Sequence, residues 1–462
     1  MTGTRERWRG WTVVHGGRTP PPGEVVAPDE RLSWPRTIGL GGQHVVAMFG
    51  ATFVFPVLMG LNPNIAILMS GVATALFLLI TKGRIPSYLG SSASFVGGVA
   101  AIRAQGGDSA AVTGAIVVAG VALLVIGLVV HRLGAGWVTR VLPPAVTGAV
   151  VMLIGFNLAG VAGTVYWPQD QWAALVTMVV VMAAAVLLPG FWGRIGVLIG
   201  LVAGFAFSWL LDLTTGPVTS PDANGDVVTR MRVDLSGVGE AGWVGLLPAT
   251  MPGPDGMEIA GWHLPTFSLT FALLVLPSVI ALVAENTGHV KAVQGMTGAD
   301  LDPYLGRALA ADGLGTTLAG TVGGSPTTTY AENIGVMAAT RVYSTAAYWV
   351  AAAVAVLLGF CPKFGALIVA VPGGVLGGLT VVLYGMVGLL GATIWVRAGV
   401  DLGHPANLVP LAAGLIIGIG DASLSVGGFE LSGISLGTIV VLVGYHALHA
   451  LLPADRRPSP PS

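Results

Sequence analysis

The apolar stretch AAVTGAIVVAGVALLVIGLVV, residues 110–130, decides the fold class. It contains 21 consecutive residues without Lys, Arg, Asp or Glu. A helix needs about 20 mainly apolar residues to cross the roughly 30 Å hydrocarbon core of a bilayer, whereas buried helices of soluble proteins have shorter apolar runs. The stretch therefore predicts a transmembrane helix.

Similar apolar runs recur along the whole chain. Including this stretch, twelve runs are long enough to cross a bilayer, at roughly 37–60, 64–81, 110–130, 141–163, 171–190, 194–212, 266–288, 305–322, 343–361, 364–391, 406–421 and 432–452. Two further apolar segments, 86–103 and 323–340, are interrupted by Gly, Pro, Ser and Thr. With both counted, we expect an all-α polytopic membrane protein with 14 transmembrane segments, of which the third and tenth are discontinuous.

The distribution of Lys and Arg favours this count. If the N-terminus is cytoplasmic and 14 segments alternate, 17 of the 21 Lys and Arg residues lie on the cytoplasmic side. Leaving out the two interrupted segments keeps both termini inside but moves Arg132, Arg140 and Arg194 outside. Cytoplasmic loops carry an excess of positive charge, so 14 segments with both termini in the cytoplasm is the better prediction.

Composition excludes several other classes of protein. Charged residues make up 9% of the chain, against about 25% in soluble domains, and the mean hydropathy is +0.81. A net charge of −1 without a basic stripe argues against nucleic-acid binding. The single Cys361 excludes an intramolecular disulfide and a Cys-rich metal site. We expect no metal and no cofactor.

Three segments lie outside the predicted membrane region. Residues 1–36 contain six arginines and a proline run, and residues 453–462 are rich in Pro and Ser, so we expect both to be disordered cytoplasmic tails. The connection 213–262 is rich in Gly, Pro, Asp and Thr and is expected to be an extracellular loop. Its alternating residues 226–234 are typical of a short hairpin.

The two halves of the chain share a spacing of polar residues. Gln43 and His44 lie in the first run, and the polar part of the first interrupted segment begins at Ser91, 48 residues after Gln43. Glu285 in the eighth segment precedes Glu332 in the second interrupted segment by 47 residues. Seven segments per half would insert the second half upside down, as in inverted-repeat transporters, whose binding sites lie at paired interrupted helices. Coincidence remains an alternative for the spacing alone.

The two glutamates are the leading functional candidates. A charged side chain at the bilayer centre costs about 2.5–3.5 kcal/mol on insertion scales. Because no Lys or Arg lies nearby in the membrane, we expect Glu285 and Glu332 to face a polar cavity, to be protonated part of the time, or both. His289 follows Glu285 by four residues and shares its helix face. The alternative is that each glutamate caps a helix or bonds a neighbouring backbone group.

The interrupted segments add the complementary chemistry. Half-helices that begin inside the membrane leave backbone N–H groups unpaired and direct a partial positive charge at the site. A planar ring with alternating N–H and C=O groups suits such a site, since carboxylates accept from N–H, amides donate to C=O, and Tyr330 could stack on the ring. His44 could equally be a helix-packing residue. Asp312 belongs either to a proton path or to a structural hydrogen bond.

Four motifs carry a resemblance to a known family. Gln43-His-Val-Val-Ala-Met-Phe-Gly-Ala-Thr, Tyr88-Leu-Gly-Ser-Ser, Ala284-Glu-Asn-Thr-Gly-His-Val and Thr328-Thr-Tyr-Ala-Glu-Asn-Ile-Gly-Val-Met occur in this order. Over about residues 25–452 the chain resembles the nucleobase–cation symporter-2 family, also called nucleobase–ascorbate transporters. It looks most similar to the uracil/pyrimidine permease branch.

The resemblance implies an architecture and a function. It implies a 7+7 inverted repeat with a core domain (37–131 and 266–362) and a gate domain (134–212 and 364–452). It also implies proton symport of a nucleobase by a homodimer in the bacterial inner membrane, not an enzymatic reaction. By resemblance, Glu285 and Glu332 bind the base, backbone N–H groups of Ala93 and Ala331 contact it, Tyr330 lies beside it, and His289 links protonation to binding. The accessory candidates are Gln43, His44, Ser91 and Asp312.

Two positions bear on the substrate. The purine branch of the family usually has Gln where this chain has Glu332, which favours uracil. Ala93 departs from the Phe of uracil carriers, which leaves thymine or a purine such as xanthine open. An inorganic-anion exchanger is disfavoured because paired carboxylates repel anions. A membrane-embedded enzyme is disfavoured because Glu285 and His289 lack a third ligand or a nucleophile motif at matching depth.

Overall fold

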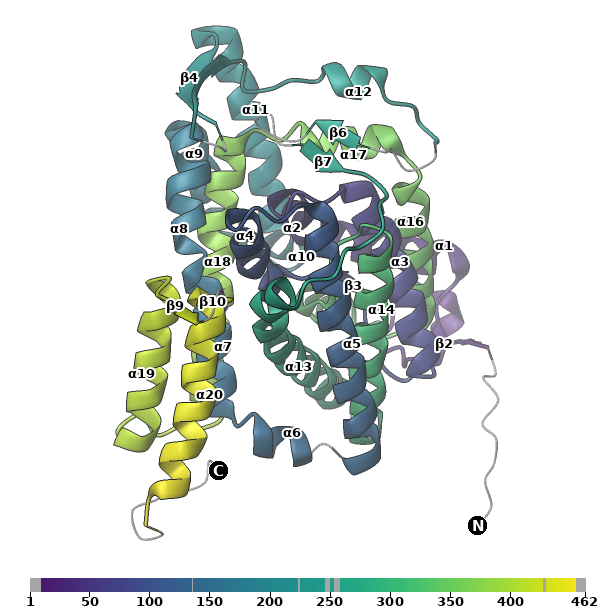
Figure 1. The fold of residues 1–462 in the computed structure, drawn as a ribbon. Coiled ribbons are helices and arrows are strands. Elements are labelled where there is room, and N and C mark those ends of the chain that lie inside the picture. Colours follow the sequence, from purple (N-terminus) through teal and green to yellow (C-terminus); the bar gives the residue numbers. More distant parts are fainter. Residues whose placement is uncertain are drawn as a thin grey trace.

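Long apolar helices build most of the protein (Figure 1). The computed structural model describes residues 10–134, 136–222, 225–245, 250–252, 258–426 and 429–453. Within these ranges eight helices are long and apolar enough to cross a membrane. They are α1 with α2 (Trp34–Leu58), α3 (Pro63–Ile80), α5 (Ser109–Leu133), α7 with its continuation (Pro144–Gln169), α11 (Gly196–Thr215), α13 (Leu269–Thr297), α18 (Gly373–Arg397) and α20 (Gly433–Leu451).

Shorter apolar elements lie at the remaining predicted positions. The helices α16 (Thr345–Gly359) and α17 (Pro362–Val369) form one bent pair with an angle of 82°. The helices α9 (Gln171–Leu187), α14 (Leu305–Thr321) and α19 (Pro405–Ile419) coincide with predicted runs but have only 17, 17 and 15 residues. The multi-span helical architecture is therefore confirmed, with eight or nine candidate spans in the described chain. The count of 14 stays a prediction.

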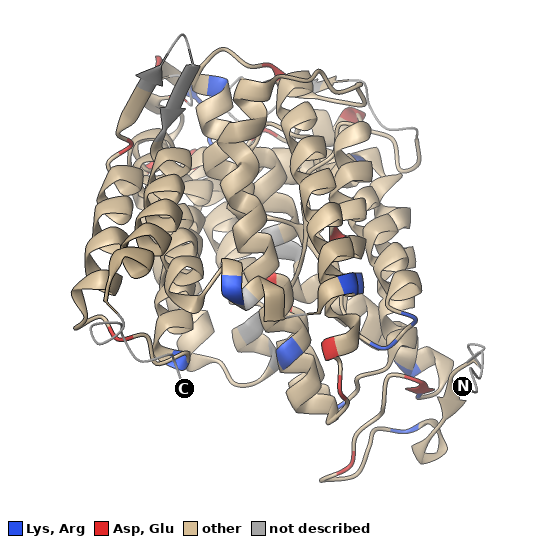
Figure 2. Ribbon diagram, turned by 60° about the horizontal axis from the view of Figure 1, so that its bottom comes forward, with Lys and Arg blue, Asp and Glu red and all other residues tan. Residues whose placement is uncertain are grey.

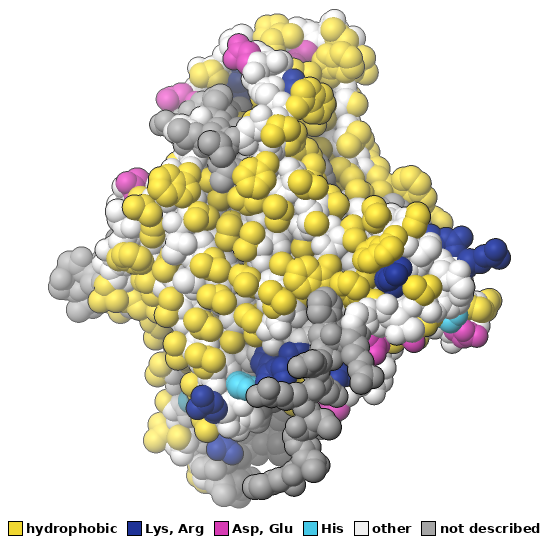
Figure 3. Space-filling model, turned by 90° about the vertical axis from the view of Figure 1, so that its right-hand side faces the viewer, with side chains coloured by type: hydrophobic (Ala, Val, Ile, Leu, Met, Phe, Trp, Pro, Cys, Tyr) yellow, Lys and Arg dark blue, Asp and Glu magenta, His cyan; other side chains and the backbone are white. Residues whose placement is uncertain are grey.

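The surface matches a lipid environment. Hydrophobic side chains cover the middle of the face in Figure 3, and Figure 2 shows Lys, Arg, Asp and Glu mostly toward the two ends of the helices. Val186 of α9, Leu213 of α11 and Ile416 of α19 are 80%, 70% and 74% exposed. Apolar surface on this scale is unfavourable in water, so a bilayer is the solvent that these helices require.

The helices pack in two groups. In one group α5 packs against α13 and α14, and α16 packs against α1 and α3. In the other group α18 packs against α7 and α9, while α19 and α20 pack on each other and on α7. Figure 1 shows α7 and α18–α20 on the left and α3, α5, α14 and α16 on the right. Close approach of α5 and α14 requires glycine, since a Cβ atom on Gly127 or Gly306 would collide with the facing backbone.

The two interrupted segments are discontinuous, as the sequence predicts, and they meet each other. The first contains strand β3 (Leu89–Ser91), a 3-10 turn (Ala93–Phe95) and α4 (Val96–Ala104). The second contains β8 (Thr327–Thr329) and α15 (Ala331–Thr340). The strands pair antiparallel, with Gly90 opposite Thr328. Non-helical backbone at membrane depth must have its polar groups paired, and here each half of the chain supplies the partner of the other.

The prediction of disorder for residues 1–36 is wrong for residues 10–36, of which the last three begin α1. Strands β1 (Thr12–Val13) and β2 (Glu30–Arg31) pair in parallel. The backbone of Val26 bonds to Arg341 O and Tyr343 N at 2.9 and 2.8 Å. Both hydrogen bonds join backbone groups of the tail to the segment between α15 and α16. Amino-acid composition describes side chains, so it does not predict such contacts. Residues 1–9 and 454–462 lie outside the described chain, and both of its ends lie toward the same end of the molecule (Figures 1 and 2).

The predicted extracellular loop contains two small hairpins and is bound to the helices. Strand β4 (Val218–Pro221) pairs with β5 (Val227–Arg230), and β6 (Thr250–Pro252) pairs with β7 (Glu258–Ala260). Arg232 bridges Asp170 at the start of α9 and Asp212 near the end of α11, at 2.5 and 3.1 Å. On the other side of the loop, Lys363 Nζ donates to Val238 O at 2.9 Å. The loop is therefore bound to α9, α11 and α17.

Candidate functional site

Glu285 lies between the two discontinuous segments. It is partly buried on α13. Thr328 Oγ1 of β8 donates to its Oε2 at 2.7 Å, and Ser94 Oγ of the 3-10 turn donates to its Oε1 at 3.2 Å. One hydroxyl group from each half of the chain therefore binds one oxygen of this carboxylate. Hydrogen bonds of this kind offset the cost of placing a carboxylate inside the membrane.

Glu332 lies close to Glu285. It is the second residue of α15, a helix that packs against α13. The two carboxylates interact electrostatically. A carboxylate in the first turn of a helix is stabilised by the helix dipole. The structure thus brings together, inside the protein, the two glutamates that the sequence places 47 residues apart.

The backbone candidates lie at helix starts. Ala93 begins the 3-10 turn that leads into α4, and Ala331 is the first residue of α15. First-turn N–H groups have no acceptor within their own helix, so they are available to other acceptors. One of these groups is already used, since Ser94 N donates to Ser92 Oγ at 3.3 Å. The two helix starts flank the carboxylates from opposite halves of the chain.

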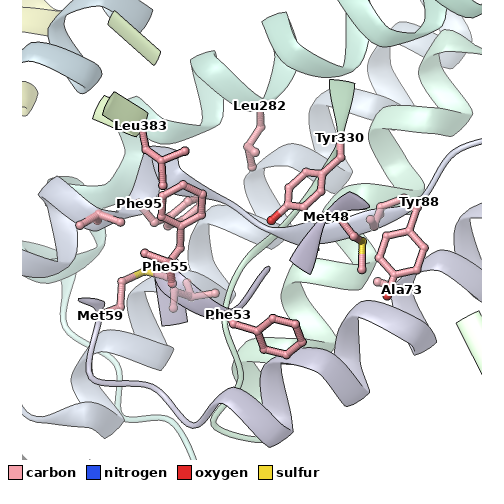
Figure 4. Close-up of a cluster of buried hydrophobic side chains, with 14 of the residues drawn as sticks. Met48, Phe53, Phe55, Met59, Ala73, Tyr88, Phe95, Leu282, Tyr330 and Leu383 are labelled. Atoms are coloured by element: carbon pink, nitrogen blue, oxygen red, sulfur yellow. The ribbon is translucent and has the colours of Figure 1, made fainter. Parts of the chain in front are cut away.

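Tyr330 connects the paired strands. Its hydroxyl group donates to Ser91 O at 2.5 Å, and only 5% of the residue is exposed. A Cβ atom on Gly90 would lie 2.7 Å from the Tyr330 ring, so glycine is required there for the ring to cross β3. Figure 4 shows Tyr330 in a cluster of buried side chains with Leu282 and Met48. Ser91 is buried as well, and its side chain donates to Thr52 O at 3.2 Å.

Asp312 lies behind the Glu285 carboxylate. It is fully buried on α14 and accepts hydrogen bonds from Asn286 Nδ2 at 2.7 Å and Thr327 Oγ1 at 3.0 Å. Asn286 follows Glu285 in the chain, and Thr327 precedes Thr328. Asp312 also interacts electrostatically with Glu285. Asp312 therefore links α14 to both α13 and β8.

The histidine candidates differ in their surroundings. His44 on α1 is buried, with Nδ1 3.3 Å from Asn333 Oδ1 and its ring centroid 4.3 Å from that of Tyr348. These contacts join α1 to α15 and α16, and the neighbouring Gln43 is partly buried. His289 is buried one turn after Glu285, close to the Pro86 backbone, although neither ring nitrogen has hydrogen-bond geometry to a described residue.

Hydroxyl and amide residues complete the site, and sequence reasoning missed them. They are Ser94, Ser278, Asn286, Thr327 and Thr328, all of which are buried. Three of them, Asn286, Thr327 and Thr328, adjoin or belong to the quoted motifs, but Ser and Thr are too common in membrane helices to be selected by type. No group of three or more His, Cys, Asp or Glu side chains that could hold a metal lies in the part of the chain that the structure describes.

A cavity of about 1110 Å³ lies elsewhere, lined in part by the loop 213–262, and is called the outer cavity below. Its lining includes Asp170, Arg232, Asp234 and Glu240. Two of these charges, Asp170 and Arg232, are paired with each other. The cavity contains neither a discontinuous helix nor any of the buried acids on α13, α14 and α15. We therefore place the candidate site at Glu285 and Glu332 and treat the outer cavity as the alternative binding site.

Comparisons with known proteins agree on one family. The family model named Xan_ur_permease and described as "Permease family" matches residues 35–426. The chain is 46% identical to "Putative pyrimidine permease RutG" of Escherichia coli (strain K12), over 93% of this chain and 92% of that protein. It is 35% identical to "Uracil permease" of Bacillus subtilis (strain 168), over 91% of this chain and 93% of that protein.

Solved structures of low sequence identity share the fold. The transmembrane domain of the cyanobacterial bicarbonate transporter BicA matches with a TM-score of 0.54 at 15% identity, covering 89% of this chain and 96% of that one. Murine Slc26a9, an anion transporter in its inward-facing state, matches with a TM-score of 0.61 at 12% identity, covering 90% and 68%. At these identities the likeness concerns the fold alone.

Proposed function

This chain belongs to the permease family that its residues 35–426 match, the nucleobase–cation symporter-2 family, and we propose that it imports uracil or a related pyrimidine by proton symport. It is a nucleobase transporter, not an enzyme. The choice of pyrimidine is supported by the relatives, which are named pyrimidine and uracil permeases. It is also supported by Glu332, which stands where the purine branch usually has Gln.

One observation carries the proposal: Glu285 is held between the two discontinuous segments, with Glu332 close by. Uracil is a small planar ring whose edge alternates N–H and C=O groups. A carboxylate is an acceptor of N–H bonds, and first-turn amides are donors to C=O. In the proposed complex the two glutamates accept from the ring, and the amides of Ala93 and Ala331 donate to it.

The density of acids around the site supports proton coupling. Glu285 interacts with both Glu332 and Asp312. Neighbouring negative charges repel each other, and this repulsion is strong where water is scarce. A proton taken up on Glu285, Glu332 or His289 relieves the repulsion, so the proton and the base favour each other's binding. Asp312 is the accessory acid of this group.

The proposed architecture provides alternating access. We assign residues 37–131 and 266–362 to a core domain and 134–212 and 364–452 to a gate domain, with 14 transmembrane segments in a 7+7 inverted repeat. The separate packing of α5 with α14 and of α7 with α18 supports this division. Motion of the core against the gate would expose Glu285 to either side of a bacterial inner membrane. We further propose a homodimer with both termini in the cytoplasm.

Uptake into proteoliposomes tests the proposed function. Purified protein should accumulate labelled uracil under an inward proton gradient, and an uncoupler should abolish accumulation. Moving one charge across 100 mV is worth about 2.3 kcal/mol, which supports more than about tenfold accumulation. Excess thymine, xanthine, sulfate and bicarbonate in parallel samples identify the preferred substrate. Accumulation that ignores the proton gradient would contradict symport, and competition by sulfate or bicarbonate would instead support anion exchange.

A second substrate class is favoured by one residue. Ala93 is partly buried at the start of the 3-10 turn, where uracil carriers have the larger Phe. A smaller side chain leaves more room beside the proposed ring position, which suits thymine or xanthine. Stronger competition by xanthine than by thymine in the uptake assay would support a purine permease over a pyrimidine permease.

A further inference from the structure

Ser94 connects the first discontinuous segment to α13 at two separate points. Its side chain donates to Glu285 Oε1 at 3.2 Å, and its backbone oxygen accepts from Ser278 Oγ at 2.6 Å. Ser278 and Glu285 are seven residues apart, about two helical turns, so they lie on the same face of α13. Ser94 and Ser278 are both buried.

The second discontinuous segment supplies the matching contact. Thr328 Oγ1 donates to Glu285 Oε2 at 2.7 Å, and its strand β8 is paired with β3 just before Ser94. The two oxygens of the Glu285 carboxylate are therefore bound by hydroxyl groups from two directions. A carboxylate has about four lone-pair positions, so two remain for other donors.

Two donors on opposite oxygens fix the rotation of a carboxylate. The terminal torsion of Glu is otherwise broad, with no strongly preferred value. A group that is already oriented loses less conformational entropy when its ligand binds. Ser94 and Thr328 together therefore determine where the two remaining lone pairs of Glu285 point.

We propose that Ser94 is a positioning residue for nucleobase binding, which orients the Glu285 carboxylate so that its free lone pairs accept the N–H groups of a pyrimidine ring. The proposal rests on the proposed function of the same site. It assigns to a serine side chain a role that neither the motifs nor the family resemblance assigns to it.

The geometry separates this role from a purely structural one. The backbone oxygen of Ser94 remains bound to Ser278 when the Ser94 side chain is removed. Ser94→Ala therefore leaves the segment attached to α13 and frees only Oε1 of Glu285. Ser94→Thr retains the hydroxyl group and is the conservative rescue. Ser435→Ala is the matched control, because Ser435 is also a buried serine that bonds to α13, through Leu273 O at 3.2 Å.

The test compares these three variants with the unsubstituted protein in uracil uptake and thermal unfolding. Ser94→Ala is expected to raise the KM for uracil about tenfold, which corresponds to about 1.4 kcal/mol, with Vmax and the melting temperature unchanged. Ser94→Thr should restore most of the affinity, and Ser435→Ala should behave as the unsubstituted protein does.

Three results would overturn the proposal. One is an unchanged KM in Ser94→Ala while the unsubstituted protein transports uracil, which refutes the positioning role and leaves the proposed function intact. Another is a joint fall of Vmax and melting temperature without rescue by Ser94→Thr, which assigns Ser94 a structural role. The third is an unsubstituted protein that neither binds nor transports uracil, which overturns the proposed function and this inference together.

Discussion

Glu285→Gln is expected to abolish uracil transport and to weaken uracil binding by about 100-fold or more, which corresponds to at least about 2.7 kcal/mol. The carboxylate accepts from Ser94 and Thr328 and keeps two lone pairs for the ring. Glutamine has the same shape but one acceptor oxygen, and its NH2 group would face a donor. Hydrogen bonds to a charged group are worth about 1.5–3 kcal/mol each. The variant loses two such bonds between the carboxylate and the ring, so its loss of binding free energy is larger than that from removing one neutral hydrogen bond.

The matched control for this prediction is Glu240→Gln. Glu240 is exposed on α12 (Ser236–Glu240) and lines the outer cavity. The two variants make the same chemical change, one at the candidate site and the other in the outer cavity. Equilibrium binding of labelled uracil to detergent-solubilised protein measures both. Loss of binding in Glu240→Gln with retention in Glu285→Gln would place the substrate in the outer cavity and refute the proposed site.

Glu332→Gln is expected to change which base is preferred. Glu332 lies in the first turn of α15 and interacts with Glu285. A carboxylate only accepts hydrogen bonds, whereas an amide also donates them, so Gln can donate to the unprotonated imidazole nitrogen that a purine has and uracil lacks. We expect uracil affinity to fall by about tenfold or more, which corresponds to about 1.4 kcal/mol, and the relative affinity for xanthine to rise.

Competition against labelled uracil by thymine, xanthine and hypoxanthine measures this change. Glu332→Asp is the control that keeps the charge, and it should bind uracil more weakly without changing the order of preference. An identical order of preference in Glu332→Gln and the unsubstituted protein would remove the argument that Glu332 selects pyrimidines.

The helices could be predicted from the sequence because bilayer thickness imposes one simple requirement. The run 110–130 became α5 (Ser109–Leu133) and the run 64–81 became α3 (Pro63–Ile80). The predicted helix ends were wrong where a helix continues beyond its apolar run. The helix α13 extends to Thr297, although its apolar run was predicted to end at 288, because the polar residues that follow are also helical. The run 364–391 also proved to be two helices, since α17 ends at Val369 and α18 begins at Gly373.

The acids of the candidate site could be predicted, but their partners could not. Glu285 and Glu332 stand out because charge is rare and costly in a membrane. The pairing of β3 with β8 joins residues more than 230 positions apart through three-residue strands, which are too short for any periodic signal. Nothing in the sequence distinguishes Ser94 and Thr328 from other hydroxyl residues. Only the fold shows that they donate to the two oxygens of Glu285.

A structure of the protein with bound uracil tests the central claim most directly. The account predicts a ring beside Glu285, between the first turns that begin at Ala93 and at Ala331, with its N–H groups within hydrogen-bond distance of Glu285 and Glu332 and its C=O groups facing those two turns. A ring bound in the outer cavity beside Arg232, or one that contacts neither glutamate, would contradict it.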